Sequence, residues 1–376
     1  MGLKCTTCSG VRTGRAARHR RRPAVVVAGA ALVAAIVAFG SLRGGSESRP
    51  AEREVVAGRS FERDVELIRP AGARIAGTLR LPERSGRGQV PAALIIPGFG
   101  PTDRDGVNVA DGQADGLYRD LSERLATAGV ASFRYDKRGT GRSALPREGR
   151  LSFDDMAADA GAGIDFLSER SEVDGDALVA VGHDEGALLA MRVAASDPRV
   201  KALVLVSSPG RPLVDVIADD FRATHGEARA DELRAVAAGL MATGELPPPE
   251  ALPADLRGFF PRDQVGYLRE IFAIDPVAYA RQVHVPVLVV RGERATFTTA
   301  ADAQRLVEAL GPRAELLVAP GAGPTLAPAG RANGAGGHTT ASTSDHGASR
   351  TNPERAGVLD RISSWLAGRL AAPTRR

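Results

Sequence analysis

Residues 177–190 read Ala-Leu-Val-Ala-Val-Gly-His-Asp-Glu-Gly-Ala-Leu-Leu-Ala, and this stretch decides the fold. Its first five residues form a continuous apolar run of strand length, and its last four are strong helix formers. Between them, Gly182 and Gly186 flank three polar residues, which indicates a turn too tight for a Cβ atom at either glycine. The stretch therefore predicts a buried strand that turns sharply into a helix, with Asp184 at the tip of the turn.

Short apolar runs and helical patterns alternate on both sides of this turn. The predicted strands are 65–68, 75–81, 92–96, 131–135, 177–181, 202–206, 286–290 and 314–318. The predicted helices are 117–128, 153–168, 185–196, 301–310 and 354–370. Such alternation is typical of a mostly parallel sheet with helices on both faces. We therefore predict an α/β fold with an eight-stranded sheet in a domain spanning residues 61–376.

One connection is too long for a simple crossover. About 75 residues of helix-like sequence, interrupted by three consecutive prolines at 247–249, separate the predicted strands 202–206 and 286–290. This insertion predicts a helical lid over about residues 209–283. A second irregular stretch, 319–352, is rich in Gly, Ala, Thr and Ser and reads as a loop.

The N-terminal 60 residues have a different composition. Residues 1–22 carry seven basic residues and no acidic one, residues 23–40 are uncharged and mainly apolar, and residues 41–60 read as a linker. Eighteen residues of helix would reach about 27 Å, close to the thickness of the hydrocarbon core. The charge bias predicts a single-pass transmembrane anchor with a cytoplasmic N-terminus and an extracytoplasmic body. The alternative is a signal peptide cleaved near Gly40, which would release the body.

Composition narrows the possible functions further. The chain has 43% hydrophobic and 25% charged residues, as an ordinary globular protein does. Outside the basic tail, 42 basic residues stand against 45 acidic ones, and aromatic residues make up only 4% of the chain, so we expect no nucleic-acid binding. The two cysteines, Cys5 and Cys8, lie in the tail without further metal ligands. No phosphate-binding loop, dinucleotide fingerprint or metal cluster is visible, so we expect no cofactor and no metal.

Three further segments match one family in the same order as the turn at Asp184. They are Pro97-Gly-Phe-Gly-Pro-Thr-Asp-Arg-Asp-Gly106, Tyr135-Asp-Lys-Arg-Gly-Thr-Gly-Arg-Ser143 and Val285-Pro-Val-Leu-Val-Val-Arg-Gly292. With the strand-turn-helix of residues 177–190, they make the chain resemble the α/β-hydrolase superfamily, in particular bacterial esterases and serine-aminopeptidase-like hydrolases. The resemblance covers about residues 61–370 and implies an α/β-hydrolase fold with a lid, in which the turn at Asp184 is the nucleophile elbow.

The same resemblance implies a Ser nucleophile, an acid after the seventh strand and a His after the eighth. At these positions the chain has Asp184, Ala295 and Pro324. The amides of Phe99 and Glu185 would form the oxyanion hole. Loss of the Ser and His functions costs about 10⁶ in acyl-transfer rate in the best-studied case. We therefore predict a pseudohydrolase that binds an unidentified small hydrophobic ligand or a protein partner.

Asp184 has a structural interpretation beside the catalytic one. An Asp at this position is a good helix N-cap, because its carboxylate can accept amide hydrogen bonds at a helix start. With an ordinary pKa it would be ionised at neutral pH and would occupy the oxyanion hole. His183, in this interpretation, is only the variable residue of the turn.

An alternative keeps Asp184 as a catalyst. Epoxide hydrolases and haloalkane dehalogenases, which share the implied fold, use an Asp at the elbow to attack carbon and a His to activate water. Here that base would be His338 or His346, in the loop that normally supplies it. Tyr267 and Tyr279 lie in the predicted lid, where epoxide hydrolases place tyrosines that protonate the epoxide oxygen.

A further alternative is an active ester hydrolase with relocated residues. Ser207 and Ser208 follow the predicted strand 202–206 and are the nearest candidates for another nucleophile. Neither lies within a glycine-flanked turn of the kind that contains Asp184.

Overall fold

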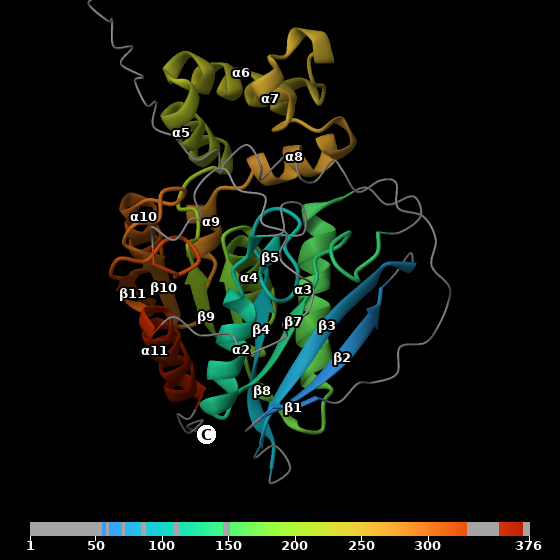
Figure 1. The fold of residues 1–376 in the computed structure, drawn as a ribbon, viewed down its shortest axis with the longest axis vertical. Coiled ribbons are helices and arrows are strands. Elements are labelled where there is room, and N and C mark those ends of the chain that lie inside the picture. The colour runs from blue at the N-terminus through green and yellow to red at the C-terminus, as the bar shows by residue number, and fades with distance from the viewer. Residues whose placement is uncertain are drawn as a thin grey trace, which may run out of the picture.

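The computed structural model describes residues 55–57, 60–69, 72–83, 88–108, 113–145, 151–328 and 353–370. A nine-stranded sheet forms the centre of the molecule (Figure 1). Its strands, in their order across the sheet, are β1 (Val55–Ala57), β2 (Ser60–Ile68), β3 (Arg74–Pro82), β7 (Ala131–Tyr135), β4 (Val90–Ile96), β8 (Val173–His183), β9 (Val200–Val206), β10 (Val287–Gly292) and β11 (Ala314–Ala319). A second, two-stranded sheet pairs β5 (Val107–Asn108) with β6 (Gln113–Ala114).

The pairing pattern determines where the predicted elbow lies. β1, β2, β3 and β7 pair antiparallel in succession, whereas β7, β4, β8, β9, β10 and β11 are parallel neighbours. The carboxyl ends of parallel strands meet at one edge, where open α/β sheets bind their ligands. β8 lies between β4 and β9, so Asp184 follows a strand in the middle of this edge.

All eight predicted strands form, and the sheet is mostly parallel as expected. β1 is an additional strand that lies inside the range predicted as a linker, 41–60, and it pairs with β2. Its three residues are too few to give a recognisable strand pattern.

Helices cover both faces of the sheet (Figure 1). Helices α3 (Phe153–Ser168), α4 (Glu185–Ser196) and α10 (Ala300–Leu310) contribute to one hydrophobic core, and α2 (Leu117–Thr127) and α11 (Pro353–Leu370) contribute to the other. Successive residues of β4 alternate between these cores: Leu94 and Ile96 belong to the first, and Ala93 and Ile95 to the second. A continuous apolar strand is therefore buried on both sides.

The long insertion between β9 and β10 is helical. It contains α5 (Leu213–His225), α6 (Glu227–Thr243), α7 (Ala254–Arg257), α8 (Val265–Phe272) and α9 (Pro276–Arg281). Figure 1 shows α5 to α8 above the strands, whereas α9 lies lower down and packs against α4 and α10. We call α5 to α8 the lid; the predicted range 209–283 also includes α9.

Several predictions fall outside the described residues. These are the basic tail 1–22, the anchor 23–40 and the two histidines His338 and His346. Among the residues that the structure does describe, no helix combines the length and apolar character needed to cross a membrane.

Candidate active site

The turn after β8 has the geometry of an elbow. Asp184 has φ 47° and ψ −115°, a conformation that non-glycine residues rarely adopt. A Cβ at Gly182 would lie 2.2 Å from the carbonyl oxygen of Gly186, and a Cβ at Gly186 would lie 2.4 Å from that of Ile96. Both glycines are therefore required by close backbone approach, and the backbone strain at Asp184 is of the kind found at functional sites.

The Asp184 side chain differs from its predicted roles. It occupies the N-cap position of α4 but makes no capping hydrogen bond. Its Oδ2 lies 3.5 Å from His183 Nε2, and its Oδ1 is buried without a hydrogen-bond partner among the described residues. The predictions of a hydrogen-bonded N-cap and of a carboxylate bound by the oxyanion amides are both wrong, because Oδ2 lies beside the His183 ring and neither oxygen accepts a backbone amide of the described residues.

The charge of Asp184 is also disfavoured. The side chain is only 16% exposed, and burial raises the pKa of its carboxyl above the ordinary value, although His183 and Lys137 oppose this rise. Asp184 therefore keeps its proton to a higher pH than an Asp with the ordinary pKa that we expected.

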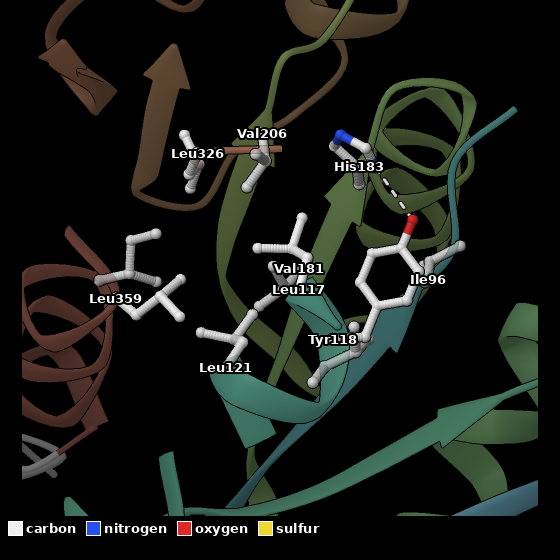
Figure 2. A pocket seen from close by; sticks show the side chains of 11 residues that line it. Ile96, Leu117, Tyr118, Leu121, Val181, His183, Val206, Leu326 and Leu359 are labelled. Carbon is white, nitrogen blue, oxygen red and sulfur yellow. Dashed lines mark hydrogen bonds between the residues drawn. The ribbon is translucent and has the colours of Figure 1, made fainter. Parts of the chain in front are cut away.

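His183 contacts Asp184, and both of its ring nitrogens have partners. Nδ1 lies 2.9 Å from the hydroxyl oxygen of Tyr118 (Figure 2). Nε2 lies 3.2 Å from the carbonyl oxygen of Pro324. A carbonyl only accepts, so this network assigns the proton to Nε2, and Nδ1 accepts from Tyr118. Burial raises the pKa of Tyr118, which keeps its hydroxyl a donor, and the same oxygen accepts the amide of Gly98 at 2.8 Å.

Pro324, at the predicted His position, lies beside the elbow through this contact. Its carbonyl oxygen also accepts a 2.6 Å hydrogen bond from Ser207 Oγ. Ser207 has φ 47°, as Asp184 does at the end of the neighbouring strand. Ser207 is buried, however, and its hydroxyl is engaged in this hydrogen bond. Ser208 donates to the carbonyl of Pro209 at 3.3 Å. Neither serine is therefore placed as a free nucleophile.

Ala295 follows β10, as the predicted acid position requires. Its amide donates to the carbonyl of Gly292, its own carbonyl accepts from Arg291, and its side chain is buried. A methyl group offers no charge to orient an imidazole, and the structure places no carboxylate in contact with His183 other than Asp184 among the described residues.

The two predicted oxyanion amides are unoccupied by protein groups. Neither the Phe99 amide nor the Glu185 amide forms a hydrogen bond to another described residue. The Phe99 ring is buried and packs edge-on against Phe297, with the ring centroids 5.8 Å apart. A Cβ at Gly98 would lie 2.8 Å from His183 Nδ1, so Gly98 lets this loop approach the elbow closely.

A buried charged network lies behind the elbow and was not predicted. Glu185 is fully buried; its Oε2 lies 2.9 Å from Lys137 Nζ, and its Oε1 accepts from the Tyr267 hydroxyl at 2.5 Å. Lys137 Nζ also donates to the carbonyl of Gly98 at 2.5 Å. The network thus joins the elbow, the loop after β7, the oxyanion loop and lid helix α8. The sequence did contain a signal for the Lys137–Glu185 ion pair. The two residues follow two predicted strands, and the carboxyl ends of parallel strands meet at one edge of the sheet.

The adjacent loops are also fixed by ion pairs. Arg104 donates from Nη2 and Nε to the two oxygens of Asp136, at 2.7 and 3.0 Å. Arg138 makes a second buried pair with Asp159, at 2.5 Å.

The cavity below His183 is too small for a substrate. It has a volume of about 10 Å³ and is lined by apolar residues of the sheet, α2 and α11, together with Leu326, Tyr118 and His183 (Figure 2). This volume holds about one water molecule, and an apolar lining disfavours even that.

Comparisons with known proteins agree with this geometry. Residues 111–227 match the family model described as serine aminopeptidase, S33. Esterase EstD of Thermotoga maritima is 26% identical over 226 residues, which cover 58% of this chain and 50% of the esterase, so the match spans half the length of that curated relative.

Two solved structures show the same fold at 18% identity. A hypothetical protein of Pseudomonas aeruginosa superposes with a TM-score of 0.55, covering 83% of this chain and 95% of the other. Est1E of Butyrivibrio proteoclasticus gives a TM-score of 0.52, covering 82% and 99%. The sheet order, the strained elbow and these matches show that the chain has the α/β-hydrolase fold and is similar to esterases and serine aminopeptidases.

Proposed function

We propose that this protein is a pseudohydrolase, which binds a small hydrophobic ligand or a protein partner at the elbow and does not hydrolyse it. The observation that carries the proposal is that both ring nitrogens of His183 are engaged in hydrogen bonds. His183 is the imidazole in contact with the elbow residue, and its two nitrogens are engaged by Tyr118 and by the Pro324 carbonyl.

Acyl transfer needs an imidazole that takes a proton from a nucleophilic hydroxyl and returns it to the leaving group. At this elbow the hydroxyl is replaced by the Asp184 carboxyl. His183 Nε2 carries a proton and donates it to a carbonyl, so it has no lone pair to offer as a base. The two free amides at Phe99 and Glu185 could still bind a ligand oxygen, which is the function that remains.

We further propose that residues 23–40 tether the protein to a membrane, with the body on the extracytoplasmic side. The run of seven basic residues before this segment supports the orientation. Cleavage near Gly40, which would secrete the body, is the alternative to this part of the proposal.

The purified protein should not hydrolyse p-nitrophenyl acetate or butyrate above the buffer blank. The reason is the absence of both the hydroxyl nucleophile and an available base at the elbow. Release of p-nitrophenol measured at 405 nm checks this, with the Asp184→Ala variant as the control. Turnover that is well above the blank and disappears in Asp184→Ala would contradict the proposal.

One observation favours a second candidate, an Asp-nucleophile hydrolase of epoxides or alkyl halides. Asp184 has the strained conformation of an elbow nucleophile, and its Oδ2 lies 3.5 Å from an imidazole. Against it, burial penalises the charge that this nucleophile must carry. Tyr267 is also not free to protonate an epoxide, because its hydroxyl donates to Glu185.

Mass spectrometry separates the two candidates. We expect no covalent adduct on the intact protein after incubation with short epoxides and haloalkanes. An adduct that maps to Asp184 and is absent from Asp184→Asn would favour the second candidate. Its added mass would equal the whole molecule for an epoxide, and the molecule less hydrogen halide for a haloalkane, because the halide leaves.

A further inference from the structure

Lid helix α8 directs two polar side chains, three residues apart, to the body of the protein. The Tyr267 hydroxyl donates to Glu185 Oε1 at 2.5 Å. Glu270 Oε2 accepts the Phe153 amide at 2.6 Å and the Ser152 hydroxyl at 3.1 Å. Residues at this spacing share one face of a helix. Both contacts join the lid to the first residue of a body helix, Glu185 of α4 and Phe153 of α3.

The Tyr267 contact is held in a buried environment. Glu185 is fully buried and Tyr267 is nearly so, and the Lys137 ammonium fixes the other carboxylate oxygen. Burial and the nearby Glu185 raise the pKa of Tyr267 well above its ordinary value, so its hydroxyl remains a donor. Hydrogen bonds to charged groups are about twice as strong as neutral ones.

The Glu270 contact supplies a capping interaction from another helix. The first amides of a helix lack intrahelical partners, and negative charge near them is favourable. Ser152 already caps α3 through its hydroxyl, which accepts the Asp155 amide. Glu270 satisfies the Phe153 amide, so separation of α8 from the body would leave that amide for water.

We propose that α8 is a latch, in which Tyr267 and Glu270 hold the lid closed over the elbow and must release for a ligand to reach Asp184. The apolar residues Leu268 and Ile271 of the same helix pack in the core shared with the sheet and complete the closed state. The latch does not depend on whether the site is catalytic, because it concerns access alone.

Hydrogen–deuterium exchange of the full-length protein tests this. We compare wild type with Tyr267→Phe, Glu270→Gln and the double variant. Tyr279→Phe is the matched control, since its partly buried ring lies on α9 and its hydroxyl bonds to no described residue. In the double variant, peptides from α8 should exchange at least about tenfold faster, as expected for the loss of hydrogen bonds to charged groups. Peptides from β4 and β8 should exchange as in wild type.

A chemical probe measures access to the elbow directly. In a background with Cys5→Ser and Cys8→Ser, Asp184→Cys places the only thiol of the chain at the elbow. Its labelling by a small maleimide should be about tenfold faster when Tyr267→Phe and Glu270→Gln are added, and unchanged with Tyr279→Phe. Equal labelling and equal α8 exchange in the latch variants and the control would overturn the latch, whatever the outcome of the ester assay.

Discussion

The triple variant Asp184→Ser/Ala295→Asp/Pro324→His should hydrolyse p-nitrophenyl acetate, whereas wild type and Asp184→Ser should not. A serine alone lacks a base, because His183 donates its Nε2 proton to the Pro324 carbonyl. The side chain at position 324 starts close to the elbow, as the contact of its carbonyl with His183 shows. A correctly placed general base contributes about 10²- to 10⁴-fold, so we expect a gain of about 10²-fold or more over Asp184→Ser.

Two controls make this result interpretable. Circular dichroism and thermal unfolding must show that the triple variant folds like wild type. The variant Ala295→Asp/Pro324→His, which keeps Asp184, should be inactive toward the ester. A folded but inactive triple variant would mean that position 324 or 295 is not the lost catalytic position. Activity in Asp184→Ser alone would mean that another base, such as His338 or His346, serves the elbow.

Lys137→Met should cost about 3–5 kcal/mol of unfolding free energy, the usual effect of leaving a buried charge without its partner. Glu185 is fully buried, and Lys137 Nζ lies 2.9 Å from its carboxylate. The same change removes the bond to the Gly98 carbonyl, which holds the oxyanion loop. Urea denaturation at pH 7 measures the loss.

The matched control is Lys201→Met, because Lys201 is exposed and, among the described residues, its ammonium donates only to the Pro198 carbonyl. Its change in stability should stay within about 0.5 kcal/mol. The double variant Lys137→Met/Glu185→Gln should recover part of the loss, since both buried charges are then removed. If Lys137→Met were as mild as Lys201→Met, the pair would not hold the elbow.

The sheet was predictable because its strands are continuous apolar runs between turn residues. Ala131–Tyr135 is observed with the predicted bounds, and so are helices Phe153–Ser168 and Glu185–Ser196. Three strands were not predicted, because they are very short. β1, β5 and β6 span two or three residues each, too few for a periodic pattern.

The candidate site was predictable only where a local motif marks it. The glycine-flanked turn located Asp184 and its backbone conformation, because the motif itself requires that geometry. The environment of the side chain depends on distant segments: Tyr118 and Pro324 approach His183, and Tyr267 approaches Glu185, from 65, 141 and 82 residues away. No periodicity or spacing in the sequence encodes such contacts, so His183 was interpreted only as a turn residue.

The position of the lid within one crossover has a consequence for how such proteins diversify. β9 and β10 are parallel neighbours, so the chain between them must travel from one end of the sheet to the other. α9 makes that return beside α4 and α10, whereas α5 to α8 extend above the sheet (Figure 1). Lineages can therefore lengthen, shorten or exchange these four helices without disturbing strand register. A change in these four helices would therefore alter the surroundings of the elbow, through side chains such as Tyr267, and leave the strand pairing that forms the elbow intact.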